Sequence, residues 1–219
     1  MCSRMLTSCN LQRTWGRVAS TEQHRTNLPR LARFLSAVLN APVAAAYAFA
    51  ILVVSEDTPH PLTILFVSIF FATVVVLITL YVLARTGVTS DFYASNRETR
   101  LIPFAIAVAS FAFGVLALLF LQAPKPIIAL MLSLLVNNGI LALITLRWKI
   151  SIHANGIAGP ATVLAYSLGS TGYLFALLII PVVWARMALK AHTAGQLLAG
   201  ALLAPLVTYV LLRIYLPLV

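Results

Sequence analysis

The stretch GIAGPATVLAYSLGSTGYLFALLIIPVVWA, residues 156–185, decides how often the chain crosses a membrane. All of its residues are uncharged, and as one helix they would extend about 45 Å at about 1.5 Å per residue. The hydrocarbon core of a bilayer is only about 30 Å thick, so we expect this helix to break. The sequence LGSTG at 168–172 predicts the break, because two glycines flank a Ser-Thr pair that can cap a new helix.

The break would produce two short spans, near 154–168 and 170–187. Long uncharged runs supply the other spans, each able to cross the hydrocarbon core, at 34–55, 62–84, 101–122, 126–146 and 193–217. The sequence therefore predicts an all-α, polytopic membrane helical bundle of about seven transmembrane helices, with six as the alternative.

The composition agrees with an integral membrane protein. Hydrophobic residues make up 61% of the 219 residues and charged residues 9%, which is too apolar for an ordinary soluble domain. We expect a single transmembrane domain over 34–219, preceded by a polar basic arm over 1–33. The arm lacks the apolar core of a secretory signal, and a transit peptide and a cytosolic arm both remain open for it. The two cysteines, Cys2 and Cys9, exclude a disulfide framework.

The distribution of charge predicts the topology. Seven spans place the segments 84–100, 147–156 and 185–192 on the membrane face that holds the N-terminus. All 15 basic residues except Lys125 and Arg213 fall on this face, which the positive-inside rule makes cytoplasmic. The net charge of +10 is thereby explained by topology, and we expect no nucleic-acid partner.

The segment ARMALKAHTAGQ, residues 185–196, carries candidate chemistry at the start of the last span. His192 and Gln196 are four residues apart, so both project from one helical face near a helix N-terminus, which favours anions. Arg186 precedes them by six residues. A guanidinium that matches phosphate oxygens, beside an imidazole able to act as a nucleophile, suits phosphoryl transfer. The alternative is a set of interfacial cations that extend toward lipid headgroups.

A second segment on the same predicted face, KISIH at 149–153, supplies Lys149, Ser151 and His153. Its alternative is again a group of interfacial polar residues. A third polar feature, NNG at 137–139, lies inside a span, where we favour helix–helix hydrogen bonding over a substrate path.

Together the segments 150–153 and 185–196 resemble the later motifs of the type 2 phosphatidic acid phosphatase superfamily, whose members include membrane lipid phosphatases. One family motif reads Pro-Ser-Gly-His, and the next reads Ser-Arg, five residues, His, three residues, Asp. The resemblance covers about residues 85–200. It implies that His192 attacks phosphorus, that His153 protonates the leaving group, and that Ser151 and Arg186 hold phosphate oxygens.

The chain departs from these motifs at four positions. Ile150 and Ile152 replace the proline and glycine of the first, and Ala185 replaces the serine of the second. Gln196 stands where the aspartate would orient the nucleophile, and glutamine can accept a hydrogen bond from imidazole but cannot offset its positive charge. Losing the carboxylate should slow the chemistry.

The family's earliest motif reads Lys, six residues, Arg-Pro. Its nearest counterpart is SDFYASNRETRLIP at 90–103, where Arg97 and Arg100 are candidate phosphate ligands and Lys149 would replace the missing lysine. The alternative for this segment is a basic juxtamembrane loop.

The sequence thus favours a membrane enzyme that hydrolyses a phosphate monoester or diphosphate of a lipid or prenyl alcohol through a phosphohistidine. We expect no metal and no other cofactor, and lipid phosphate or prenyl diphosphate and membrane lipids as partners. The alternative is a non-catalytic lipid-phosphate-binding protein or transporter, in which the missing aspartate prevents turnover.

Overall fold

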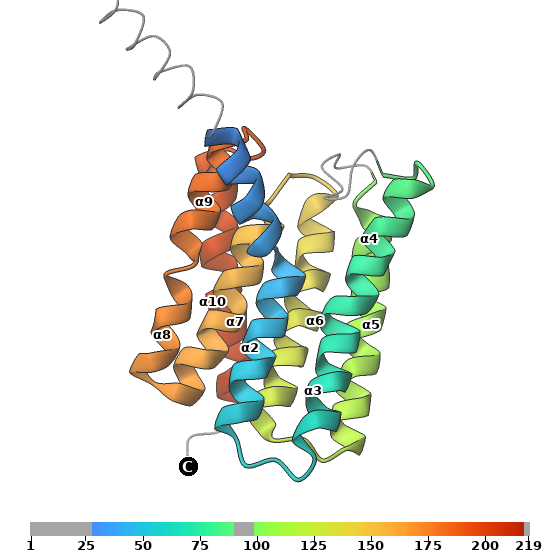
Figure 1. The fold of residues 1–219 in the computed structure, drawn as a ribbon, viewed down its shortest axis with the longest axis vertical. Helices are drawn as coiled ribbons and strands as arrows, with labels where there is room; N and C mark the ends of the chain where they lie inside the picture. The colour runs from blue at the N-terminus through green and yellow to red at the C-terminus, as the bar shows by residue number, and fades with distance from the viewer. Residues whose placement is uncertain (1–27, 90–98, 217–219) are drawn as a thin grey trace, which may run out of the picture.

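The computed structural model describes residues 28–89 and 99–216, which form a bundle of helices without a strand (Figure 1). The all-α fold and the membrane character predicted from the sequence are confirmed, since five of the described helices are long and apolar enough to cross a membrane. Counting a bent pair of helices as one span raises this number to six.

After a first helix, Leu28–Val38, the elements follow in the order α2 (Ala41–Ser55), α3 (Pro61–Ile69), η1 (Phe70–Val74), α4 (Val75–Arg85), α5 (Leu101–Phe120), α6 (Lys125–Thr145), α7 (Ile152–Leu168), α8 (Ser170–Ala176), α9 (Ile179–Ala188) and α10 (Ala194–Tyr215). The described residues place helix at every predicted span. Helix α7 has 17 residues and occupies the predicted short span 154–168.

The predicted break after α7 is present, but its cap is not the predicted one. Helix α7 ends at Leu168, and Gly169 turns the chain with φ of +62°, a left-handed conformation that glycine adopts without a Cβ penalty. Gly169 also precedes α8 as its N-cap, and no side chain caps that helix. Instead of capping α8, Thr171 donates a hydrogen bond back to the Leu168 carbonyl, at 2.9 Å between heavy atoms.

The first span differs from the prediction of one run over 34–55. The helix Leu28–Val38 begins inside the predicted polar arm and meets α2 at an angle of 51°. Asn40 causes this interruption together with Pro42, because its Oδ1 accepts a hydrogen bond from the Val43 N–H at 2.9 Å and the proline stands in the first turn of α2. Residues 1–27 of the arm lie outside the described residues.

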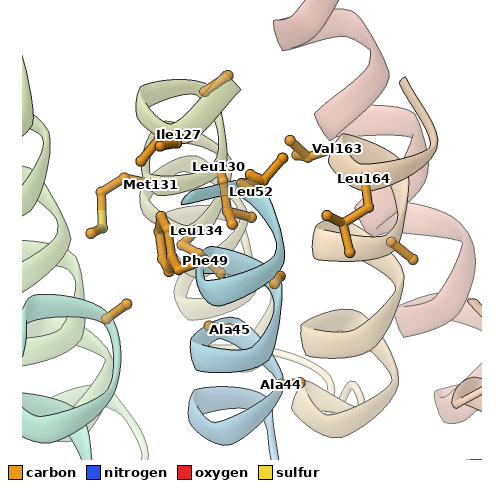
Figure 2. Close-up of a cluster of buried hydrophobic side chains, with 14 of the residues drawn as sticks. Ala44, Ala45, Phe49, Leu52, Ile127, Leu130, Met131, Leu134, Val163 and Leu164 are labelled. Carbon is orange, nitrogen blue, oxygen red and sulfur yellow. The ribbon is translucent and has the colours of Figure 1, made fainter. Parts of the chain in front are cut away.

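The hydrophobic core lies where α2, α6 and α7 meet (Figure 2). Its labelled side chains come from α2 (Ala44, Ala45, Phe49, Leu52), α6 (Ile127, Leu130, Met131, Leu134) and α7 (Val163, Leu164). Large apolar side chains such as Phe120 and Val54 are instead fully exposed at the outer surface. A surface of this kind suits lipid rather than water as the surrounding medium.

A π-helical turn, η1, interrupts the span Pro61–Arg85 and ties it to its neighbours. The Phe71 carbonyl accepts a hydrogen bond from the Ser110 hydroxyl of α5, and Thr73 donates one to the Pro42 carbonyl of α2, both at 2.7 Å. Turns of this type leave carbonyls outside the regular helical ladder, so other groups can bind them.

The segments KISIH (149–153) and ARMALKAHTAGQ (185–196) lie at one end of the bundle. There α4, α6 and α9 end and α5, α7 and α10 begin, at the end where the first helix starts (Figure 1). The loop between α2 and α3, with Glu56 and Asp57, lies at the opposite end. The helical topology therefore brings the candidate site residues to a common end.

Candidate functional site

The segments KISIH and HTAGQ meet where α7 begins beside α10. The Ser151 N–H donates a hydrogen bond to the Gln196 carbonyl at 3.2 Å, which joins the two segments directly. Gly200, one turn further along α10, faces the Ser151 carbonyl, and a Cβ at this glycine would lie 2.5 Å from that oxygen. The lack of a side chain at Gly200 therefore permits the contact.

Arg186 reaches the same region from the last turn of α9. Its Nη1 donates a hydrogen bond to the Ser36 hydroxyl of the first helix at 2.9 Å. Both side chains are buried, with 4% of Arg186 and 1% of Ser36 exposed. The first helix carries none of the family motifs. Its Ser36 nevertheless binds Arg186, the residue that the resemblance assigns to phosphate binding.

Arg100 brings the segment before α5 into the site. It is the N-cap residue of α5, is almost fully buried, and donates from Nη1 to the Ile150 carbonyl at 3.4 Å. Arg97, the other candidate of this segment, lies outside the described residues.

His153 connects these groups. It interacts electrostatically with Arg186, His192 and Arg100, and it is hydrogen bonded to the Ser36 backbone. Both histidines are buried. We call Arg100, His153, Arg186 and His192 the Arg-His cluster, since three separated parts of the sequence contribute to one buried group.

His192 and Gln196 form the predicted pair. The His192 Nδ1 and the Gln196 Oε1 are 3.2 Å apart. The same oxygen accepts from the Thr193 N–H at 3.2 Å, while the Thr193 hydroxyl accepts from the Gln196 N–H at 3.4 Å, which is a capping box at the start of α10. Gln196 Oε1 accepts a hydrogen bond from the His192 Nδ1–H in the tautomer that leaves a lone pair on Nε2, the nitrogen available for attack.

The surroundings favour an uncharged His192. Burial, with the positive charges of Arg186, Arg100 and Lys149, lowers the pKa of His192 to about 4, and the Gln196 hydrogen bond only partly opposes this shift. The imidazole is therefore neutral near pH 7, which is the form that a nucleophile requires.

An open pocket of about 480 Å³ lies outside His192. Lys149, Lys190 and Gln196 line it together with His192. Lys149 is half-buried and acts electrostatically on His192, whereas Lys190 has the left-handed φ of +50° at the turn after α9. Lys190 lies between Arg186 and His192 in the sequence, and this position could have predicted that it lies beside the site.

Ser151 has a structural role at this point. It is the N-cap residue of α7, and its hydroxyl accepts a hydrogen bond from the Ala154 N–H at 3.3 Å. The hydroxyl hydrogen is still available for donation, so the predicted contact with phosphate stays a prediction.

A second cavity, of about 100 Å³, is partly open and lies between α2, η1, α4, α5, α6 and α7. We call it the inner chamber. Arg100 and His153 line it, together with apolar side chains such as Phe104 and Leu141. The Arg-His cluster therefore borders both the open pocket, through His192, and the inner chamber, through His153.

Asn137 and Asn155 also line the inner chamber. The predicted helix–helix hydrogen bond of Asn137 is confirmed, because its Nδ2 donates to the Thr208 hydroxyl of α10 at 3.0 Å. Asn155 and Ser36 were missed as site residues. Asn155 follows His153 by two residues in an apolar helix, which is a usable signal, whereas nothing local distinguishes Ser36 from an ordinary small residue.

No protein-family model matches the chain, and neither a curated protein nor a solved structure matches it. In the parts of the chain that the structure describes, no three His, Cys, Asp or Glu side chains gather in one place.

Proposed function

We propose that the protein is a membrane phosphatase that hydrolyses a phosphate monoester or diphosphate of a lipid or prenyl alcohol through a phosphohistidine intermediate. The observation that carries this proposal is the burial of two imidazoles and two guanidiniums in one cluster, supplied by three separate segments. Guanidiniums bind phosphate oxygens, and a neutral imidazole can attack phosphorus.

In the first step, the lone pair on His192 Nε2 forms a bond to phosphorus, and the bond from phosphorus to the leaving oxygen breaks. His153 gives its proton to that oxygen, so the lipid alcohol, or the phosphate in a diphosphate, leaves in its protonated form. Arg100 and Arg186 stabilise the charge on the phosphoryl oxygens during the transfer.

In the second step, a water molecule attacks the phosphohistidine. His153, now neutral, takes a proton from the water as its oxygen bonds to phosphorus. The bond between phosphorus and Nε2 breaks, which restores neutral His192 and releases inorganic phosphate. Gln196 holds the His192 ring through Nδ1 in both steps.

The electrostatics of the Arg-His cluster support an anionic ligand. Positive charge from Arg100 and Arg186 acts on both histidines, so a phosphate dianion that binds there would be attracted and would favour a protonated His153. Burial strengthens these interactions, because water screens them less than at the surface.

The proposal is tested by measuring phosphate release from phosphatidic acid and from a prenyl diphosphate with the purified full-length protein. We expect release from at least one of them, its loss by about a thousandfold or more in His192→Ala, and an acid-labile phosphoryl label on the wild type. His60→Ala is the matched control, since His60 is exposed at the opposite end of the bundle. Release that persists in His192→Ala would contradict the histidine mechanism.

The second candidate function is a lipid-phosphate-binding protein without turnover. The neutral Gln196 partner of His192 favours it, because no carboxylate stands there to stabilise an imidazolium. This candidate predicts that vanadate raises the melting temperature by mass action while no lipid phosphate is hydrolysed.

A further inference from the structure

The inner chamber combines mainly apolar walls with two amide atoms that lack a hydrogen-bond partner. Among the residues that the structure describes, neither the Asn155 Nδ2 nor the Asn137 Oδ1 has a hydrogen-bond partner. Both asparagines are about 3% exposed, and both line the chamber. A donor and an acceptor are thus held in a mainly apolar cavity beside His153.

These two groups are costly to the fold. A buried amide atom without a partner has lost its hydrogen bond to water, and an apolar side chain of similar shape would avoid that cost. The Asn137 Nδ2 is held by Thr208, so the orientation of its Oδ1 is set by a helix–helix contact. The Asn155 Nδ2 has no comparable hydrogen bond among the described residues that would explain the place of this side chain in α7.

The side chains that line the chamber match the two parts of a lipid phosphate, its charged headgroup and its hydrocarbon. At the end near the Arg-His cluster it is lined by Arg100 and His153, and Phe104, Phe111 and Leu134 supply apolar wall. The chamber would therefore take the part of a ligand that follows the phosphate, with its hydrocarbon against these side chains.

We propose that the inner chamber binds the part of the lipid substrate next to the phosphate, and that Asn155 and Asn137 select lipids with a hydroxyl or amide group close to the phosphate-bearing carbon. Such a group both donates and accepts a hydrogen bond, so it satisfies the two amide atoms together. A prenyl phosphate, whose tail is hydrocarbon alone, would leave them without partners and bind less well. This inference rests on the proposed function for the identity of the phosphate-bearing ligand.

Dephosphorylated alcohols test the chamber without the phosphate site. We would follow the melting temperature of the full-length protein in detergent with a monoacylglycerol, which carries an additional hydroxyl and an ester, and with a prenyl alcohol of similar length. We expect the monoacylglycerol to raise the melting temperature of the wild type clearly. In Asn155→Leu, the same increase should require at least about tenfold more ligand. The prenyl alcohol should act weakly and equally on both proteins, because its single hydroxyl takes the place of the phosphate-bearing oxygen and leaves only hydrocarbon beside the two asparagines.

Asn155→Leu is also informative without ligand, because removing an unpartnered buried amide should leave the melting temperature unchanged or higher. Ser167→Ala, which removes a hydroxyl in the same helix away from the chamber, is the control and should keep the monoacylglycerol response. Asn137→Leu provides a second chamber variant, although its loss of the Thr208 contact should lower the melting temperature.

Three outcomes would overturn the inference. These are equal responses to the two alcohols, a monoacylglycerol response that survives Asn155→Leu, and no response to either alcohol, which would mean that the amides bind only water. A vanadate titration in parallel reports on the Arg-His cluster. A vanadate response without an alcohol response refutes the chamber alone, whereas an alcohol response without vanadate binding or phosphate release refutes the proposed phosphatase.

Discussion

At the scale of single residues, Gln196 controls the charge next to the proposed nucleophile. Its Oε1 lies 3.2 Å from His192 Nδ1 and carries no net charge. Glutamate has the same length and also fits a capping box with Thr193, so the exchange changes charge more than shape.

We therefore predict that Gln196→Glu raises the pKa of His192 by at least one unit, because an adjacent carboxylate stabilises the imidazolium. The acid limb of the pH profile of kcat/KM should move up by the same amount. Gln122→Glu, at the opposite end of the bundle, should leave the profile unchanged. An unchanged acid limb in Gln196→Glu would mean that His192 is not the titrating group.

The depressed pKa of His192 also makes stability depend on pH. In the unfolded chain His192 binds a proton with a pKa of about 6.5, whereas in the folded protein its pKa is about 4. The contribution of His192 to the free energy of unfolding is therefore complete above pH 6.5. It is lost as the pH falls toward 4, by up to about 3 kcal/mol. The melting temperature should accordingly fall between pH 7 and pH 4.5, and it should fall less in His192→Asn. Equal slopes for the two proteins would remove His192 as the cause.

At the scale of helices, the contact between α7 and α10 sets the site geometry. A Cβ at Gly200 would lie 2.5 Å from the Ser151 carbonyl, which is backbone and cannot move aside like a flexible side chain. Gly195 lies in the first turn of the same helix, and a Cβ there would meet no atom within 4 Å.

Gly200→Ala should therefore destabilise the protein by about 1–3 kcal/mol and reduce phosphate release, since the segment with His153 would be pushed away from His192. Gly195→Ala should retain both stability and activity. Thermal unfolding and the phosphate assay would check the pair. If the two variants behave alike, the close packing of α10 on Ser151 does not position the site.

The bend between the first helix and α2 is a second determinant at this scale. Asn40 caps α2 through the Val43 N–H, and the first helix contributes Ser36 to Arg186. Asn40→Ala should destabilise the protein by about 0.5–2 kcal/mol, because the cap hydrogen bond is lost. Asn40→Ser, which can cap in the same way, should recover most of this loss in thermal unfolding. Failure of the serine to do so would assign the effect to another contact of Asn40.

At the scale of the whole molecule, the remaining question is which membrane face carries the site. The predicted topology makes the Arg-His end cytoplasmic, through the positive-inside rule. Single cysteines at Ala188 and Asp57 would report on the two ends when introduced after Cys2→Ser and Cys9→Ser, since both positions are exposed. A membrane-impermeant maleimide should label Asp57→Cys in intact cells and Ala188→Cys only after permeabilisation. The reverse pattern would place the site on the outer face.

Much of the architecture could be predicted because it depends on local chemistry. Uncharged runs of span length locate the helices, and Gly169 ends α7 because its φ of +62° suits glycine. The bend at Asn40 was missed, although Asn-Ala-Pro is a recognisable cap, because the apolar run continues through it. Within the site, the family motifs led to His153, Arg186 and His192.

The sequence by itself determined the membrane bundle, the end at which the polar segments gather and the residue types available for phosphate chemistry. Hydropathy and spacing carry that information along the chain. Only the tertiary structure decided that Ser36 binds Arg186, that Arg100 reaches Ile150 and that Asn137 and Asn155 share one chamber. These contacts join residues far apart in sequence, so they depend on helix packing, which no local pattern encodes.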